Sequence, residues 1–169
     1  VNMRLRTVLW EEICAANVLV GKDLIRQTHS QPSGNPYTVI INSFVNSLVM
    51  RLAYLYAKRE HVPECPLFDF RKNVSLISYG DDNVLNISDR VIDWYNQNTI
   101  TQGLKRLGFT YTDEAKSGST IPYRSLGEVG FLKRHFVQDE FGVYRAPLDF
   151  DVVLDMTNWV RGNLINIST

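Results

Sequence analysis

The sequence has few cysteines, and the two it has are isolated. Cys14 and Cys65 have no other cysteine or histidine at the spacing of metal ligands. Neither a disulfide framework nor a zinc site is therefore predicted, and a reducing compartment is the simplest inference. The three histidines, His29, His61 and His135, have no partners at catalytic spacing, so we interpret them as structural or surface residues.

An excess of charge of either sign is also missing. Lys and Arg total 18 and Asp and Glu total 18, which gives a formal net charge of 0 at pH 7. Any contact with nucleic acid must then come from local basic patches rather than from bulk attraction. The patches present are Lys58-Arg59, Arg71-Lys72, Lys105-Arg106 and Lys133-Arg134-His135.

No long apolar run is unbroken. The stretch from Val39 to Ala57 is interrupted by polar and charged residues, among them Asn42, Asn46 and Arg51. Such residues make it unsuited to the apolar interior of a bilayer. We therefore predict no membrane span in this segment.

The length of 169 residues and the 44% hydrophobic content suit one domain with its own core. The chain starts at Val1 rather than at a methionine, and it ends at Thr169 directly after an amphipathic stretch that shows no stop signal. We interpret it as an excerpt of a longer protein.

What the sequence does contain is a pair of adjacent carboxylates between two predicted strands. Tyr79-Gly80-Asp81-Asp82 separates the β-branched and apolar runs 74–78 and 84–87, and its glycine favours a tight hairpin turn. The two like charges repel, so a shared divalent cation would keep both ionised. Oxygen ligands of this kind suit Mg²⁺ or Mn²⁺. Taken alone, the motif is equally compatible with a solvated turn that binds no metal.

Hydrophobic periodicity predicts the other elements. Helices are expected over 4–16, 37–59, 91–107 and 149–162, and strands over 23–28 and 109–112. Segments 129–132 and 136–137 are expected to flank a further strand or hairpin, with Gly142 turning the chain back. Pro63 and Pro66 are expected to end the long second helix, and Gly108 to end the third. This mixed order predicts an α+β domain, in which helices back an antiparallel sheet.

The long predicted helix carries a polar stripe opposite its apolar face. Thr38, Asn42 and Asn46 recur every four residues and therefore lie on one face. The stripe comes after Ser33-Gly34, a small and flexible pair that can bring backbone N–H groups close to a ligand. Neighbouring backbone groups or water are the alternative partners for these polar side chains.

Four motifs succeed one another in a fixed order. They are Pro32-Ser33-Gly34 with Thr38 and Asn42-Ser43, then Tyr79-Gly80-Asp81-Asp82, then Leu107-Gly108-Phe109-Thr110 with Lys116-Ser117, and last Phe131-Leu132-Lys133-Arg134. In this order they resemble motifs B, C, D and E of the RNA-dependent RNA polymerases of positive-strand picorna-like viruses. The insect-virus branch of that group is the most similar.

The resemblance implies a right-hand polymerase palm over residues 1–147 and the start of an α-helical thumb over 148–169. It implies RNA-templated RNA synthesis, by transfer of a nucleotide from a nucleoside triphosphate to a primer 3′-hydroxyl with two Mg²⁺ or Mn²⁺ ions. The partners would be an RNA template and primer, nucleoside triphosphates and other viral replication proteins. The place would be the host cytoplasm, in membrane-associated replication complexes.

The same resemblance gives roles to the acidic turn and to the polar stripe. Asp81 would bind the catalytic metals, and Asp82 would support them from nearby. The incoming nucleotide would be bound by Ser33, Gly34, Thr38 and Asn42. Asn42 would sense the ribose 2′-hydroxyl, a task that suits an amide because it donates and accepts at once.

Three basic residues take roles from the later motifs. Lys116 would protonate the leaving pyrophosphate as a general acid. Lys133 and Arg134 would lie against the RNA backbone, where cations give affinity without sequence choice.

The family also needs an aspartate from motif A, and we find no substitute for it. Asp23 lies in the wrong element, and Glu11-Glu12 fall on a predicted helix. We therefore expect the isolated 169 residues to be inactive. Two alternatives stay open at this point: a reverse transcriptase palm, against which Asn42 argues, and a non-catalytic scaffold module.

Overall fold

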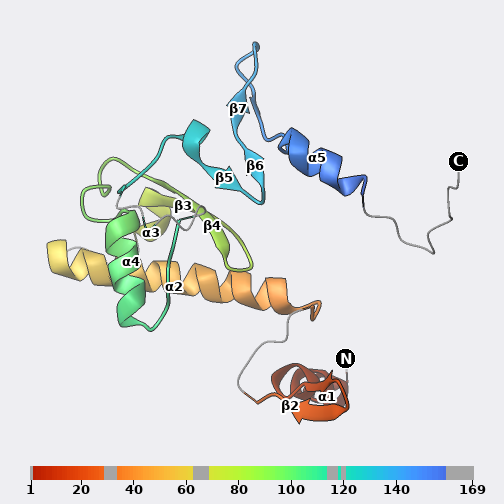
Figure 1. Ribbon diagram of the computed structural model, residues 1–169. Coiled ribbons are helices and arrows are strands. Elements are labelled where there is room, and N and C mark those ends of the chain that lie inside the picture. The colour runs from red at the N-terminus through yellow and green to blue at the C-terminus, as the bar shows by residue number, and fades with distance from the viewer. Residues whose placement is uncertain (1, 29–33, 63–68, 114–117, 119–120, 159–169) are drawn as a thin grey trace, which may run out of the picture. The chain divides into compact units, whose positions relative to one another are not determined.

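Short hairpins alternate with helices along the chain. The computed structural model describes residues 2–28, 34–62, 69–113, 118 and 121–158 (Figure 1). Within them the helices are α1 (Met3–Cys14), α2 (Thr38–His61), α3 (Phe70–Asn73), α4 (Gln97–Arg106) and α5 (Phe150–Met156), with a 3₁₀ turn, η1 (Leu126–Glu128). The strands are β1 (Asn17–Val20), β2 (Asp23–Arg26), β3 (Val74–Tyr79), β4 (Asp82–Ile87), β5 (Gly130–Phe131), β6 (Arg134–His135), β7 (Val137–Gln138) and β8 (Tyr144–Arg145).

The strands pair only with their neighbours in sequence. The described residues form four two-stranded sheets, β1-β2, β3-β4, β5-β6 and β7-β8. The predicted α+β class is confirmed at this level. The single antiparallel sheet of a polymerase palm, backed by helices, stays a prediction.

Two compact units divide the chain, and each is described by itself. The first comprises residues 1–49 and 76–83, and the second residues 50–75 and 84–169. The division passes through α2 and through both strands of the β3-β4 hairpin, so the first unit holds the tip of that hairpin.

An aromatic cluster forms the core of the second unit. Tyr54 on α2 is fully buried, and its ring centroid lies 5.2 Å from that of Phe70, 5.1 Å from that of Trp94 and 4.9 Å from that of Tyr95. Rings at these separations add attraction beyond the area they bury. The Tyr95 hydroxyl donates to the Met50 carbonyl oxygen at 2.9 Å, and burial raises the pKa of Tyr95.

A buried lysine joins this core to α3. Lys58 is 2% exposed, and its Nζ lies 2.6 Å from Oδ1 of Asp69. Tyr54 donates to the same oxygen at 3.0 Å, and the Asn73 amide donates to the Tyr54 hydroxyl at 3.1 Å. The charge removed from water is thus paired and hydrogen-bonded, as a buried ammonium requires.

Helix α4 begins six residues later than the periodicity predicts. The expected start was Val91, but the helix starts at Gln97, after the N-cap Asn96. The Asn96 side chain accepts from the backbone N–H of Asn98 and Thr99, and the Thr99 hydroxyl accepts from the Asn96 N–H at 2.9 Å. Val91 is buried, but it lies in the turns that precede α4. Its apolar side chain fits the helical periodicity although the residue is not helical. The capping box fixes the start, because it satisfies N–H groups that have no helical partner.

Helix α4 ends as predicted, but the segment after it does not form the expected strand. Gly108 has φ +83°, and the N–H groups of Gly108 and Phe109 donate to Lys105 and Leu104, the pattern that commonly terminates a helix. The strand predicted over 109–112 is wrong, since this segment has no strand partner among the described residues. Phe109 instead uses its N–H to close the helix.

The remaining expectations are met in part. The helices expected over 4–16 and 37–59 are confirmed as α1 and α2, and the strand expected over 23–28 is β2. Its partner β1 and the short α3 were not predicted. The last helix, α5, ends at Met156, and residues 159–162 lie outside the described residues, as do Pro63 and Pro66.

Helix α2 is also long and apolar enough to cross a membrane by length and composition, with a mean hydropathy of 1.4 over its most apolar window. One face of this helix is apolar and exposed, with large side chains every four residues at Ile40, Phe44, Leu48, Leu52 and Tyr56. Helix α4 packs on the second half of α2 (Figure 1), so closely that a Cβ on Gly103 would lie 3.5 Å from that of Ala53. Composition alone thus does not support the prediction of no span, and 22% of that window is buried inside the structure.

Candidate functional site

The acidic motif forms the tip of a two-residue hairpin. Tyr79 ends β3, Gly80 and Asp81 make the turn, and Asp82 begins β4. Gly80 has φ +64°, which suits glycine at the first position of such a turn. Gly80 is buried, whereas Asp81 and Asp82 are exposed.

Asn46 of α2 binds the backbone of this turn. Its side-chain Nδ2 donates to the carbonyl oxygens of Gly80, Asp81 and Asp82, at 3.3, 2.8 and 3.4 Å. Its Oδ1 accepts from Nδ2 of Asn83 at 3.1 Å. The side chain of Asn46 therefore holds the acidic turn by its main chain.

Ser43, one turn earlier on α2, adds a second attachment. Its Oγ accepts from the Gly80 N–H at 2.8 Å and donates to the Val39 carbonyl at 2.6 Å. The Ser78 hydroxyl donates to the Ser43 carbonyl at 3.4 Å. Gly80 thus has both its N–H and its carbonyl bonded to α2.

The two carboxylates have no cationic partner in the described part of the chain. Each ion pair found there involves another acidic residue. Adjacent and exposed carboxylate oxygens are a donor set that fits Mg²⁺ or Mn²⁺. Among the described residues no third His, Cys, Asp or Glu joins them in a metal-sized group.

The nucleotide-binding candidates lie toward the start of α2. Asn42 is half-buried and precedes Asn46 by four residues, so the two share a helix face about 6 Å apart along the axis. Thr38 is the first residue of α2, one further turn away. Gly34 is exposed with φ +85°, and Ser33 lies outside the described residues.

The basic candidates of the fourth motif lie on the β5-β6 hairpin of the second unit. Its two turn residues, Leu132 and Lys133, have φ +54° and +59°, a conformation that side chains other than glycine adopt rarely. The Arg134 guanidinium donates to the Ala146 carbonyl at 2.7 Å, so part of its capacity serves the fold. Lys133 is exposed. Lys116 lies outside the described residues.

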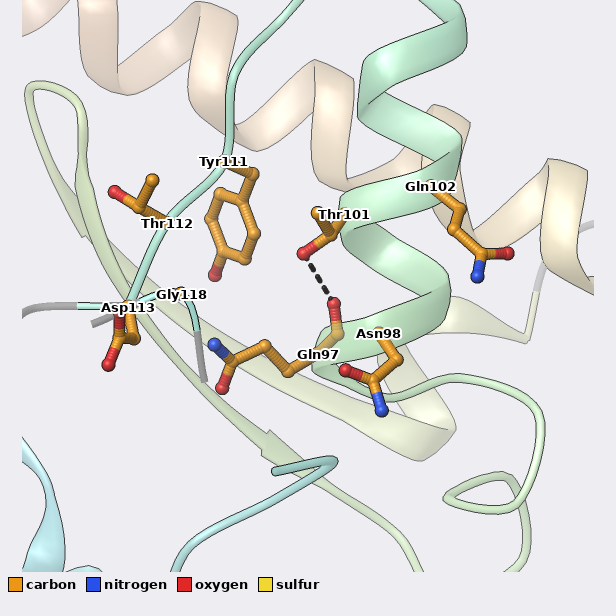
Figure 2. A pocket seen from close by; sticks show the side chains of 8 residues that line it. All are labelled: Gln97, Asn98, Thr101, Gln102, Tyr111, Thr112, Asp113 and Gly118. Atoms are coloured by element: carbon orange, nitrogen blue, oxygen red, sulfur yellow. Dashed lines mark hydrogen bonds between the residues drawn. The ribbon is translucent and has the colours of Figure 1, made fainter. Parts of the chain in front are cut away.

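A hollow of about 430 Å³ opens in the second unit beside α4 (Figure 2). Most of the residues that line it have polar side chains, and the Thr101 hydroxyl donates to the Gln97 carbonyl at 2.7 Å. At its other side Asp113 pairs with Arg124 at 3.1 Å. None of the described candidate residues lines this hollow.

Comparison with known proteins decides the family. The sequence model described as "Viral RNA-dependent RNA polymerase" matches residues 2–168. The chain belongs to the viral RNA-dependent RNA polymerase family. It is 45% identical over 165 residues to the replicase polyprotein of Cricket paralysis virus and 42% identical over 171 residues to that of Acute bee paralysis virus, with 96% of the chain covered in both. The resemblance drawn from the motifs, including the insect-virus branch, is confirmed.

This member of the polymerase family spans only a small part of such relatives. It covers 9% of each of those two replicase polyproteins and 5% of the genome polyprotein of Deformed wing virus, to which it is 36% identical.

Sequence reasoning missed what Asn46 and Ser43 do in this polymerase segment. Asn46 was visible as the third member of the polar stripe, and Ser43 as part of the first of the four motifs. Their partners lie 34–37 residues further along the chain. No spacing within α2 indicates them.

Proposed function

We infer that this chain supplies part of the palm of an RNA-directed RNA polymerase, which extends a primer by nucleotidyl transfer from a nucleoside triphosphate on an RNA template. One observation carries the proposal. The turn with two exposed carboxylates is hydrogen-bonded to the helix face that bears Asn42, four residues from Asn46. Metal-binding and ribose-reading groups then belong to one surface, as templated nucleotidyl transfer requires.

Asp81 and Asp82 would hold two Mg²⁺ or Mn²⁺ ions together with the motif A aspartate expected elsewhere in the polymerase. Such ions activate the primer hydroxyl and stabilise charge on the triphosphate and the leaving pyrophosphate. The exposure of both carboxylates and the lack of a cationic partner among the described residues support this role. Asp81 would be the principal ligand and Asp82 the supporting one.

Asn42 would read the ribose 2′-hydroxyl, with Thr38, Ser33 and Gly34 beside it. The amide of Asn42 can donate to and accept from a hydroxyl, which a deoxyribose lacks. Gly34 has no Cβ and therefore tolerates its φ of +85°, so a ligand could approach its backbone before α2.

The basic candidates would act on phosphates. Lys116 would donate a proton to the leaving pyrophosphate as a general acid. Lys133 would contact the RNA backbone from the strained β5-β6 turn, and Arg134 would do so with the donors that Ala146 does not use. Strain of this kind gathers at functional sites.

The wider assignment follows from the family. Residues 1–147 would form palm and 148–169 the start of the thumb, and other viral replication proteins would join them in membrane-associated complexes of the host cytoplasm. A chain without a motif A aspartate should not extend primers by itself.

The test is primer extension by the full-length polymerase carrying Asp81→Asn. This change keeps the shape of the side chain and removes its charge, so incorporation should fall about 10³-fold or more, as expected when several kcal/mol of charge stabilisation are lost. Asp89→Asn, at an exposed position just beyond β4, is the matched control and should leave incorporation unchanged. Undiminished synthesis by Asp81→Asn would overturn the proposal.

A further inference from the structure

Asn46 stands apart among the buried polar side chains. Three such residues occur in the described part of the chain, Asn46 at 6% exposure, Lys58 at 2% and Asn96 at 9%. Lys58 neutralises Asp69, and Asn96 caps α4. Both of those uses stabilise the fold locally. Asn46 is the one whose polar atoms reach the acidic turn.

Every polar atom of the Asn46 side chain is directed at that turn. A side-chain amide has two N–H donors and one carbonyl acceptor. The donors are shared among three successive backbone carbonyls, of which that of Asp81 is the closest at 2.8 Å, and the acceptor receives the amide of Asn83 at 3.1 Å. The contacts converge from one side chain onto four consecutive residues, 80–83.

A neutral amide is the side chain that can do this without occupying the carboxylates. A lysine here would bring a cation to Asp81 and Asp82 and compete with divalent metals for them. An aspartate would offer no donor to the three carbonyls and would add a third negative charge. Asparagine satisfies the backbone and leaves both carboxylates ionised and unpaired.

We propose that Asn46 is a positioning residue that fixes the direction of the Asp81 and Asp82 carboxylates relative to Asn42. Asn42 lies one helical turn away on the same rigid helix. The attachment through Asn46 therefore fixes the position of the metal-binding turn relative to the amide that would read the ribose. Ser43 supports it by accepting from the Gly80 N–H at 2.8 Å, which prevents the turn from rotating about the Asn46 contacts. The inference rests on the proposed function of the site.

The experiment compares Asn46→Leu and Asn46→Gln in the full-length polymerase, with Mg²⁺ titrated in primer extension. Leucine removes all four contacts and keeps the same branching of heavy atoms, whereas glutamine keeps the amide on a longer stem. Partners that orient metal ligands are typically worth about 10- to 100-fold. Asn46→Leu should therefore lower kcat about 10- to 100-fold and raise the Mg²⁺ concentration for half-maximal rate by a similar factor, and Asn46→Gln should recover part of both.

The half-maximal Mg²⁺ concentration separates positioning from folding. A variant that merely folds poorly loses active enzyme, which lowers the rate but leaves the metal requirement of the remaining molecules unchanged. If Asn46→Leu does not fold, the same titration is made on Asn46→Gln and Asn46→Ser. The control is Asn86→Asp, on the exposed face of β4, which should keep both the wild-type rate and the wild-type Mg²⁺ dependence.

The outcomes distinguish this inference from the function beneath it. Wild-type Mg²⁺ dependence in every folded Asn46 variant, together with an inactive Asp81→Asn, overturns the positioning role and keeps the polymerase site. Full activity of Asp81→Asn overturns both. A raised Mg²⁺ requirement, partly restored by glutamine, supports the inference.

Discussion

Helix α2 holds two aspartates in opposite ways. At Asp69 it offers the ammonium of Lys58, 2.6 Å from the carboxylate. At Asp81 it offers the amide of Asn46, 2.8 Å from the backbone carbonyl, and leaves the carboxylate alone. A carboxylate paired with a buried cation is committed to the fold, whereas one held by its main chain keeps its charge available. The partner that α2 offers thus differs between Asp69, whose carboxylate is paired in the fold, and Asp81, which we propose to bind metal.

The pairing with Lys58 changes the pKa of Asp69. Partial burial alone would raise the pKa of Asp69, but hydrogen bonds from Lys58 and Tyr54 and the attraction of the ammonium outweigh it and lower that pKa below its usual value. The ionised form is therefore the one that the folded chain stabilises.

The largest effects are expected when the charge of Asp69 or of Asp81 is removed in the full-length polymerase, on stability in the first case and on nucleotide incorporation in the second. Asp69→Asn should destabilise the fold by about 3 kcal/mol, because it removes the negative charge 2.6 Å from the buried Lys58 ammonium. Asp81→Asn, whose side chain is exposed, should leave the Tm unchanged while incorporation is lost. Thermal unfolding and primer extension below the unfolding range measure the two effects. Equal Tm values for both variants would break the comparison.

Lowering the pH should weaken the stabilisation that the ionised Asp69 carboxylate gives to the fold. Since the folded-state pKa of Asp69 is lowered, the unfolded chain binds more protons at acid pH, and the stabilisation by the ionised carboxylate is fully present above about pH 4 and lost as pH falls through that lowered pKa. The Tm difference between wild type and Asp69→Asn should shrink as pH drops from about 5 toward about 3. Unfolding scans at constant ionic strength measure it, with Asp89→Asn for comparison. A difference that stays constant over this range contradicts the pairing.

A smaller effect is expected at the turn itself. Gly80 and Gly21 both have φ +64°, and neither has any atom within 4 Å of an added Cβ. Alanine at either position should cost about 1 to 2 kcal/mol, because L-residues disfavour this conformation. Only Gly80→Ala should also reduce incorporation, as it disturbs the turn that carries the acids. Matched Tm losses with unequal activities are the expected result, and matched activities would contradict it.

The smallest effect is expected at Gly103, where α4 meets Ala53 of α2. An added Cβ at Gly103 would lie 3.5 Å from that of Ala53, an ordinary contact. Gly103→Ala should raise stability by up to about 1 kcal/mol through helix propensity, without changing incorporation. Unfolding of this variant beside Gly103→Leu, which is too large for the contact and should lower the Tm, tests how tightly the two helices pack.

The sequence was sufficient where local chemistry decides the outcome. The glycine and β-branched runs around Asp81 predicted the hairpin, and the three- and four-residue periodicity predicted α2. Periodicity was insufficient at Val91, because a buried side chain in a turn looks the same as one in a helix. It was insufficient at Phe109 as well, where the N–H closes α4 instead of joining a sheet.

The candidate site divides in the same way. Two adjacent carboxylates after a glycine form a motif of four consecutive residues, so Asp81 and Asp82 could be named as candidates from the sequence. The role of Asn46 could not, because its partners are backbone carbonyls that any sequence possesses. Only tertiary packing brings those carbonyls to α2.

The backbone of the β5-β6 turn should limit which residues positions 132 and 133 can accept. With Leu132 and Lys133 both in the left-handed region, valine, isoleucine and threonine at either position would force a branched Cβ against the backbone. Asparagine and glycine would relax it. Passage of a randomised genome library should therefore deplete the three β-branched residues at both codons, whatever their charge or size does to RNA affinity.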